Sequence, residues 1–328
     1  MRDRVKIPAK HPAWPFLKFL VSLGTILLLL WIVDWQRAGQ VLGNVRLGPL
    51  CLAPLLSLAG VGIGAARWSL LMGGAGFRLP VLEAYRGYLY GWLYNLFLPS
   101  ALGGDVIRVG FAAKRSGCGI GPATVVVLTE RILGLAATGT LLVTGALLFP
   151  HHALRMLAPF DDRLPLLLSV VGGACLFVFF GAAILLRGRA PGPGRPRTGK
   201  FFDALSPIRH LTPKLLPGVI LLSLCFQFAD ILMSLLLAKA LGLNVDLTVF
   251  LLVLPVVYLV TALPISLGGL GLREGSLAFL LSRFGILASD GITLSFLILL
   301  ARMFVGGIGG LLQLQNSLKG GGERPPGA

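Results

Sequence analysis

Long apolar runs alternate with short polar segments along most of the chain. The runs are unbroken, as in Leu27–Leu30 and Val125–Leu128, whereas the strands of a membrane β-barrel would alternate apolar and polar residues with a period of two. A helix needs about 20 residues to cross a hydrocarbon core of about 30 Å, and in lipid only helices and closed barrels satisfy their backbone polar groups. The pattern therefore predicts an all-α, polytopic integral membrane protein.

Six of the runs are long enough to span a bilayer, and two further apolar segments are interrupted. In the first of these, the apolar stretch Tyr88–Leu98 is too short to span before Pro99; the second is interrupted at Pro264. We interpret the segments 84–113 and 248–286 as re-entrant hairpins that turn within the membrane. The spanning helices are expected over residues 17–36, 49–72, 120–149, 164–186, 215–241 and 290–316.

Composition and charge support a helical membrane protein and narrow the classes of molecule that it is expected to bind. Hydrophobic residues make up 55% of the 328 positions and charged residues 13%, against about 25% charged in soluble domains, so a water-soluble enzyme is not expected. The net charge is +16, but the basic residues cluster outside the apolar runs, in 1–18 and 187–214, which favours cytoplasmic loops under the positive-inside rule and attraction to anionic lipid. Nucleic acid is not an expected partner.

These assignments give a domain plan with both termini in the cytoplasm. The plan consists of a basic N-terminus at 1–16, one membrane domain at 17–316 and a tail at 317–328; within the membrane domain, half-repeats at 49–149 and 215–316 are joined across a basic linker at 187–214.

An internal repeat connects the two interrupted segments. Leu98–Arg108 aligns without gaps on Leu263–Arg273, and six of the eleven positions are identical. The two copies lie about half the chain apart. Because helix 49–72 is expected to run inward and helix 215–241 outward, the halves form an inverted repeat, an arrangement in which transporters hold substrate near the midplane.

The residues at the two breaks are suited to binding an anion. Proline breaks a helix and paired glycines allow another group to approach closely, while a helix that restarts there directs N–H groups and the positive end of its dipole at the break. Arg108 and Arg273 follow within about a turn, and the planar guanidinium can bond two phosphate oxygens. We expect Asn95 to cap or line the first break. The candidate residues at the breaks are Asn95, Pro99, Gly103, Gly104, Pro264, Gly268 and Gly269.

Eight charged residues fall at membrane depth, where each costs about 2.5 to 3.5 kcal/mol unless it has a partner or a wet cavity. Two alternatives remain open. The charges could form ion pairs that only hold the hairpins, chiefly Glu130 with Arg131, or they could line a site; Asp230 could coordinate a coupling cation or bond an arginine. The residues interpreted as interface anchors are Trp68, Tyr85, Tyr88, Tyr90, Trp92 and Tyr94. The four acids and four arginines are Asp105, Glu130, Asp230, Glu274, Arg108, Arg131, Arg273 and Arg302.

No sequence pattern supports metal binding, cofactor binding or nucleophilic catalysis. The four cysteines are dispersed without a C-x-x-C pair, the four histidines fall in predicted loops, and no Ser/His/Asp or Cys/His arrangement is present. We therefore expect no metal, no cofactor and no catalytic residue.

Three motifs resemble one known family. Asn95–Pro99 with Gly103–Arg108, then Glu130–Leu135, then Leu263–Gly275 resemble the lysylphosphatidylglycerol synthase transmembrane region, also called the flippase-like domain family, and the likeness extends over about 15–316. The resemblance implies an inner (plasma) membrane protein that translocates a phospholipid or glycolipid. Larger members carry a soluble aminoacyl-transferase domain, and because no segment of that size follows Gln315, lysine transfer is not expected.

The leading hypothesis is a flippase-like transporter with anionic membrane lipids as partners. Arg108 and Arg273 would hold the phosphate of the head group, oriented by Asp105 and Glu274, while Glu130, Arg131 and Arg302 would form a surrounding layer or a gate. A second hypothesis is a membrane-embedded lipid-phosphate or polyprenyl transferase with Asp105 or Glu130 as base. A third is a non-transporting subunit of an enzyme that makes envelope lipids.

Overall fold

The structure is a computed structural model, and it describes residues 39, 43, 45–97, 103–157, 215–262, 266 and 269–320. In this part of the chain the regular elements are all α-helices. Their bounds are Leu47–Gly74 (α3), Val81–Phe97 (α4), Gly103–Ser116 (α5), Ile120–Leu148 (α6), Pro150–Leu157 (α7), Leu216–Ala240 (α11), Leu247–Ala262 (α12), Leu272–Ser282 (α13) and Ala288–Gly320 (α14).

Four of the helices, α3, α6, α11 and α14, are long and apolar enough to cross a membrane. They correspond to four of the six expected spans, and three of them match the expected ends to within two residues. The fourth, α14, continues to Gly320, beyond the expected end at residue 316. The other two expected spans, 17–36 and 164–186, lie outside the described residues.

The two interrupted segments each form a pair of short helices that pack against one another, α4 with α5 and α12 with α13. The turns between the helices fall largely outside the described residues, and so do three of the candidate residues: Pro99, Pro264 and Gly268. The part that is described shows how α13 begins. Gly269 and Gly271 adopt positive φ angles of 79° and 80°, a conformation that glycine adopts without steric cost.

The long helices α3 and α11 end in the same way. The N–H of Phe77 bonds the carbonyl of Met72 and the N–H of Leu243 bonds the carbonyl of Ala238, both at 2.9 Å. Each bond closes a turn whose glycine, Gly76 or Gly242, has a positive φ, the hydrogen-bond pattern of a Schellman helix end. The two halves of the chain therefore share this helix ending.

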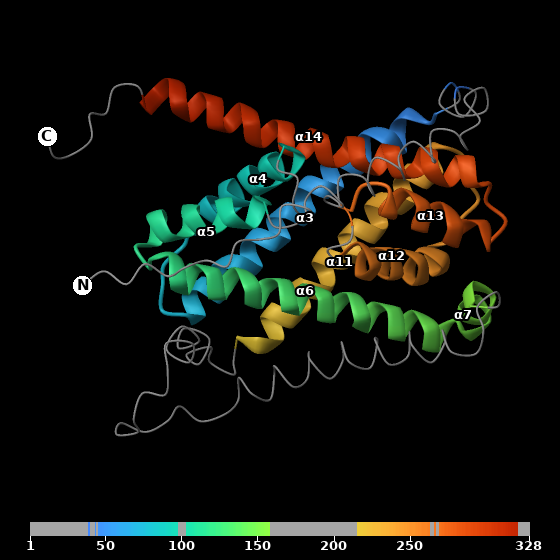
Figure 1. Cartoon of the computed structure of the whole chain (residues 1–328), viewed down its shortest axis with the longest axis horizontal. Helices are drawn as coiled ribbons and strands as arrows, with labels where there is room; N and C mark the ends of the chain where they lie inside the picture. The colour runs from blue at the N-terminus through green and yellow to red at the C-terminus, as the bar shows by residue number, and fades with distance from the viewer. Residues whose placement is uncertain are drawn as a thin grey trace, which may run out of the picture.

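Helix packing is reciprocal between the two halves (Figure 1). The helices α3 and α11 lie against one another; α4 packs on α14 while α12 packs on α6, and α5 packs on α6 while α13 packs on α14. Figure 1 shows α14 and α6 along opposite sides of the molecule, with the α4–α5 pair toward one end and the α12–α13 pair toward the other. Each short helix pair is thus held between the two halves of the chain.

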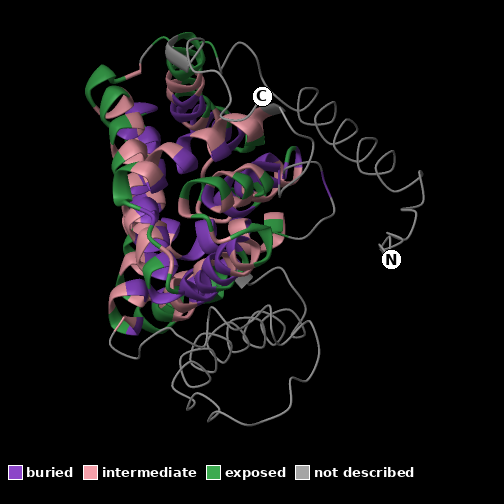
Figure 2. Ribbon diagram, turned by 90° about the vertical axis from the view of Figure 1, so that its left-hand side faces the viewer, coloured by how far each residue is buried: buried purple, intermediate pink, exposed green. Residues whose placement is uncertain are grey.

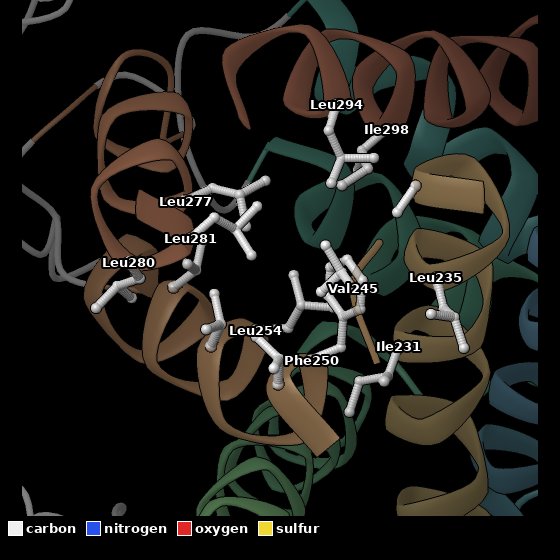
Figure 3. Packing of buried hydrophobic residues seen from close by; sticks show 14 of the residues in the cluster. Ile231, Leu235, Val245, Phe250, Leu254, Leu277, Leu280, Leu281, Leu294 and Ile298 are labelled. Carbon is white, nitrogen blue, oxygen red and sulfur yellow. The ribbon is translucent and has the colours of Figure 1, made fainter. Parts of the chain in front are cut away.

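Buried residues gather where the helices face one another, and exposed residues lie on their outer sides (Figure 2). The apolar core around α12 shows the packing in detail: Phe250 and Leu254 lie among side chains of α11, α13 and α14 (Figure 3). Large apolar residues such as Leu52, Leu300 and Leu311 remain exposed on the outside, as expected for surfaces that contact acyl chains.

The structure corrects one expectation between the long helices. Residues 150–157, expected as part of the loop between the spans 120–149 and 164–186, form the short helix α7. The ring of His152 stacks on Phe284, with centroids 6.1 Å apart, and Ala153 and Met156 are buried in the core. The loop expectation was wrong because these apolar residues anchor a short helix against α6 and α12.

Candidate functional site

The carboxylate of Glu130 joins four helices. Arg67 on α3 donates to Oε1 from Nε at 3.2 Å and from Nη2 at 2.8 Å. Arg108 on α5 donates to Oε2, and the hydroxyl of Tyr88 on α4 donates to Oε1. All four side chains are buried. Because charge-assisted hydrogen bonds are strong where water is excluded, Glu130 ties α3, α4 and α5 to α6.

Arg108 contacts the faces of two aromatic rings. Its guanidinium carbon is 3.8 Å from the ring centre of Tyr88 and 4.3 Å from that of Trp68, within the range of a cation–π contact. The interpretation of Trp68 and Tyr88 as interface anchors is wrong, because both are buried and contact the arginine. The two rings flank the guanidinium and shield it from water.

Asp105 links an inner and an outer arginine. Its carboxylate accepts a hydrogen bond from Nε of Arg131 on α6, and its other oxygen lies 3.5 Å from Nη1 of Arg108. Glu130 and Arg131, which could have paired with one another, therefore have different partners, because adjacent residues on a helix point about 100° apart. We call Arg67, Asp105, Arg108, Glu130 and Arg131 the first arginine cluster.

A second group of charges lies on α11, α13 and α14. Nη2 of Arg302 donates to Asp230 at 2.8 Å, so the structure gives Asp230 an arginine partner. Nε of Arg273 donates to Glu274 at 3.0 Å, and both residues are buried. We call Asp230, Arg273, Glu274 and Arg302 the second arginine cluster.

Oxygen atoms of the chain itself occupy two of the backbone donors at the helix starts. The N–H of Gly104 donates to Asn95 Oδ1 at 2.7 Å, and the N–H of Gly271 donates to Glu274 Oε2, also at 2.7 Å. A head group would have to displace these oxygens to use the same donors. Each amide has a single donor, whereas each guanidinium has five, so the arginine side chains are better candidates for anion contacts than these two amides.

Gly104 is needed for the close approach of α4 and α5. A Cβ atom at this position would lie 2.2 Å from the carbonyl oxygen of Gly91 and 2.7 Å from Nδ2 of Asn95, far inside van der Waals contact. A Cβ at Gly91 would in turn meet the stem of Arg108 at 3.0 Å. The glycines thus bring Arg108 against α4, while Gly103 is buried at the start of α5.

The two clusters are neighbours along two shared helices. On α4, Tyr88 contacts Arg108 and Trp92, four residues later, lies 5.8 Å from Arg302. On α11, Phe226 lies 5.1 Å from Arg67 and Asp230, four residues later, bonds Arg302. Four residues correspond to a rise of about 6 Å. The two clusters therefore lie about one helical turn apart.

Arg67 is a site residue that the sequence pattern failed to indicate. Arg67 lies near the inner end of the helix expected at 49–72, but α3 continues to Gly74 and Arg67 is buried. With Arg67 included, the first arginine cluster holds three arginines and two carboxylates, a formal charge of +1, and the second holds two of each, a formal charge of zero. The position of Arg67 within a long apolar helix was the signal that could have identified it, as the same kind of position identified Glu130.

Metal chemistry has no visible site in the described part of the chain, where no group of three or more His, Cys, Asp or Glu side chains is placed to hold an ion. The fold and the buried charges instead define a polytopic helical membrane protein with an arginine-rich polar centre.

The chain belongs to the family described as the lysylphosphatidylglycerol synthase TM region, whose model matches residues 16–310. It is also similar to the UPF0104 membrane protein PH1989 of Pyrococcus horikoshii, with 27% identity over 120 residues. That match covers 36% of this chain and 36% of the relative, so the chain matches about a third of the relative's length. No solved structure matches the chain.

Proposed function

We propose that the protein binds an anionic phospholipid or glycolipid by its phosphate within the membrane and moves it between the leaflets. The observation that carries the proposal is the pair of neighbouring arginine clusters near the middle of long apolar helices. Glu130, Asp230 and Arg302 each lie within four residues of the centre of their helix. Charges at that depth are costly and mark substrate pathways in membrane proteins.

Charge balance favours an anionic substrate. The first arginine cluster carries a formal charge of +1, and a phosphodiester carries a charge of −1, so the occupied site would be neutral. Arg108 would hold the phosphate from the first cluster and Arg273 from the second, because each is buried and has a planar guanidinium that can bond two oxygens. The acyl chains would stay in the bilayer.

The proposed architecture is an inverted repeat with six spanning helices and two re-entrant hairpins. The reciprocal packing of α3–α6 and α11–α14 supports it, as do the matching ends of α3 and α11. Such a repeat would bring the two hairpins toward the midplane, where transporters of this type bind substrate. We further propose that the protein resides in the plasma membrane with both termini in the cytoplasm.

The transferase hypothesis gains no comparable support. Asp105 and Glu130, its candidate bases, both accept hydrogen bonds from arginines, so oxygens of both carboxylates are already engaged. An accessory role beside an enzyme of envelope-lipid synthesis would show itself as co-purification with that enzyme and no lipid exchange by the protein alone.

Leaflet exchange in reconstituted vesicles tests the proposal. The protein is placed in phosphatidylcholine vesicles with fluorescent phosphatidylglycerol, and exchange is followed as the fraction of probe reached by an external quencher. We expect faster exchange with the protein than without it, and a loss of about tenfold or more in Arg108→Gln and Arg273→Gln. Arg86→Gln, on a half-exposed ion pair with Glu83, is the control. Wild-type exchange in both variants would overturn the proposed site.

A further inference from the structure

Arg131 differs from the other arginines of the first cluster in its surroundings. Its side chain is 39% exposed, against 8% for Arg108. It shares one face of α6 with Leu128, Ile132 and Leu135, which are between 40% and 50% exposed and lie within one turn on either side. In a membrane this apolar face contacts acyl chains, so the Arg131 guanidinium lies at the boundary between the lipid and the polar centre.

Because Arg131 lies deep in the membrane, an exposed charge at this position has a high free-energy cost. It lies three residues from the middle of α6, about 5 Å along the axis, where an exposed charge is strongly disfavoured. Asp105 bonds one edge of the guanidinium through Nε and compensates part of this cost. A lipid phosphate on the exposed side would compensate more of it, because arginine bonds phosphate in a fork geometry.

The ion pairs continue inward from Arg131 without a gap. Asp105 bonds Arg131 and lies 3.5 Å from Arg108; Arg108 bonds Glu130, which in turn bonds Arg67. The exposed fraction falls from Arg131 to Asp105 and again to Arg108. A phosphate that displaced Asp105 from Arg131 would leave that carboxylate beside Arg108, its second partner.

We propose that Arg131 and Asp105 form a lateral opening between α5 and α6, through which the phosphodiester head group of a membrane phospholipid passes from the bilayer to Arg108. The inference rests on the proposed function and adds the route of access to the same site. It commits to a lipid rather than free phosphate because the exposed neighbours of Arg131 are apolar and would exclude a hydrated ion. Arg131 acts as the first phosphate contact, and Asp105 closes the opening when no lipid is bound.

Photolabelling tests the opening directly. The full-length protein in phosphatidylcholine vesicles is irradiated with phosphatidylglycerol carrying a diazirine in its head group, and labelled peptides are quantified by mass spectrometry. Labelling of residues 128–135 is expressed relative to the exposed leucines Leu311 and Leu314 of α14, a lipid-facing reference. A diacylglycerol with the same diazirine reports lipid contact without phosphate, and excess inorganic phosphate reports an aqueous route.

We expect Arg131→Gln to lower the relative labelling about tenfold, to the level of the diacylglycerol probe. A loss of this size corresponds to the loss of one charge-assisted hydrogen bond. Asp105→Asn should raise the relative labelling at least twofold, because it weakens the bond that Asp105 accepts from Arg131. An unfolded variant would not give a specific gain on α6. Arg86→Gln is the matched control, since its side chain is also 39% exposed and also paired with a carboxylate. It should leave labelling unchanged.

The outcomes separate this inference from the proposed function. If Arg131→Gln labels as the wild type does, or if inorganic phosphate abolishes the labelling, the lateral opening is wrong, whatever Arg108→Gln does to exchange. If Arg131→Gln loses labelling while Arg108→Gln exchanges lipid at the wild-type rate, the opening stands and the inner site is wrong. Loss of labelling in the first variant and of exchange in the second supports both.

Discussion

Arg67 on α3 and Glu130 on α6, 63 positions apart in the sequence, are joined by two hydrogen bonds of 2.8 and 3.2 Å to the same carboxylate oxygen. The other oxygen of Glu130 bonds Arg108. One acid therefore compensates two buried arginines, which leaves the first arginine cluster with an excess of positive charge. The connection holds the helices together and sets the electrostatic character of the centre.

Removing the charge of Glu130 should strongly destabilise the protein. In Glu130→Gln, Arg67 and Arg108 would remain buried without their shared carboxylate, and breaking a buried ion pair in this way costs about 3 to 5 kcal/mol. Thermal unfolding in detergent measures the effect. Glu83→Gln is the control, because its partners Arg86 and Arg115 are more exposed, and such pairs contribute about 0 to 1 kcal/mol. Equal shifts in the two variants would show that Glu130 is not the central connection.

A methyl group at Gly104 should separate α4 from α5. In Gly104→Ala the new Cβ would lie 2.2 Å from the carbonyl oxygen of Gly91, and overpacking of this kind costs about 1 to 3 kcal/mol. Gly110→Ala on the same helix meets nothing within 4 Å and should be neutral or gain up to about 1 kcal/mol from helix propensity. Unfolding temperatures of the two variants that move in the same direction would argue against this close approach.

The pair of Asp230 and Arg302 should behave as a coupled unit. Asp230→Asn and Arg302→Gln each leave a charge without its partner near the middle of a spanning helix, whereas the double variant removes both charges. We expect the double variant to lose less stability than the sum of the single losses, with a coupling of about 0.5 to 3 kcal/mol. Additive losses in a double-mutant cycle would mean that the contact contributes nothing.

The sequence predicted the long helices well because their apolar runs are unbroken. The expected span 215–241 became Leu216–Ala240 and the expected span 120–149 became Ile120–Leu148. The end of α14 was placed too early because its last turns are polar: the helix continues through Asn316 to Gly320, where hydropathy no longer marks it.

The partners within the site could not be predicted in the same way. A charged residue inside an apolar run is visible in the sequence, which is why Glu130 and Arg302 were found, but its partner lies on another helix. Glu130 meets Arg67 and Arg108 through the packing of α3, α5 and α6, and no local pattern encodes that meeting. Tyr88 was missed because its tyrosine neighbours suggested the membrane interface, while its hydroxyl bonds Glu130 in the interior.

Head-group selectivity tests the central claim most directly. The protein is reconstituted in nanodiscs with equal amounts of phosphatidylglycerol and phosphatidylcholine. The lipids that stay bound when the protein is released from the nanodisc are identified by native mass spectrometry. An excess positive charge at Arg67, Arg108 and Arg131 predicts that the wild type retains phosphatidylglycerol in preference to phosphatidylcholine, and that Arg108→Gln loses this preference. Equal retention of the two lipids by the wild type, or an undiminished preference in Arg108→Gln, would contradict an anion site at this cluster.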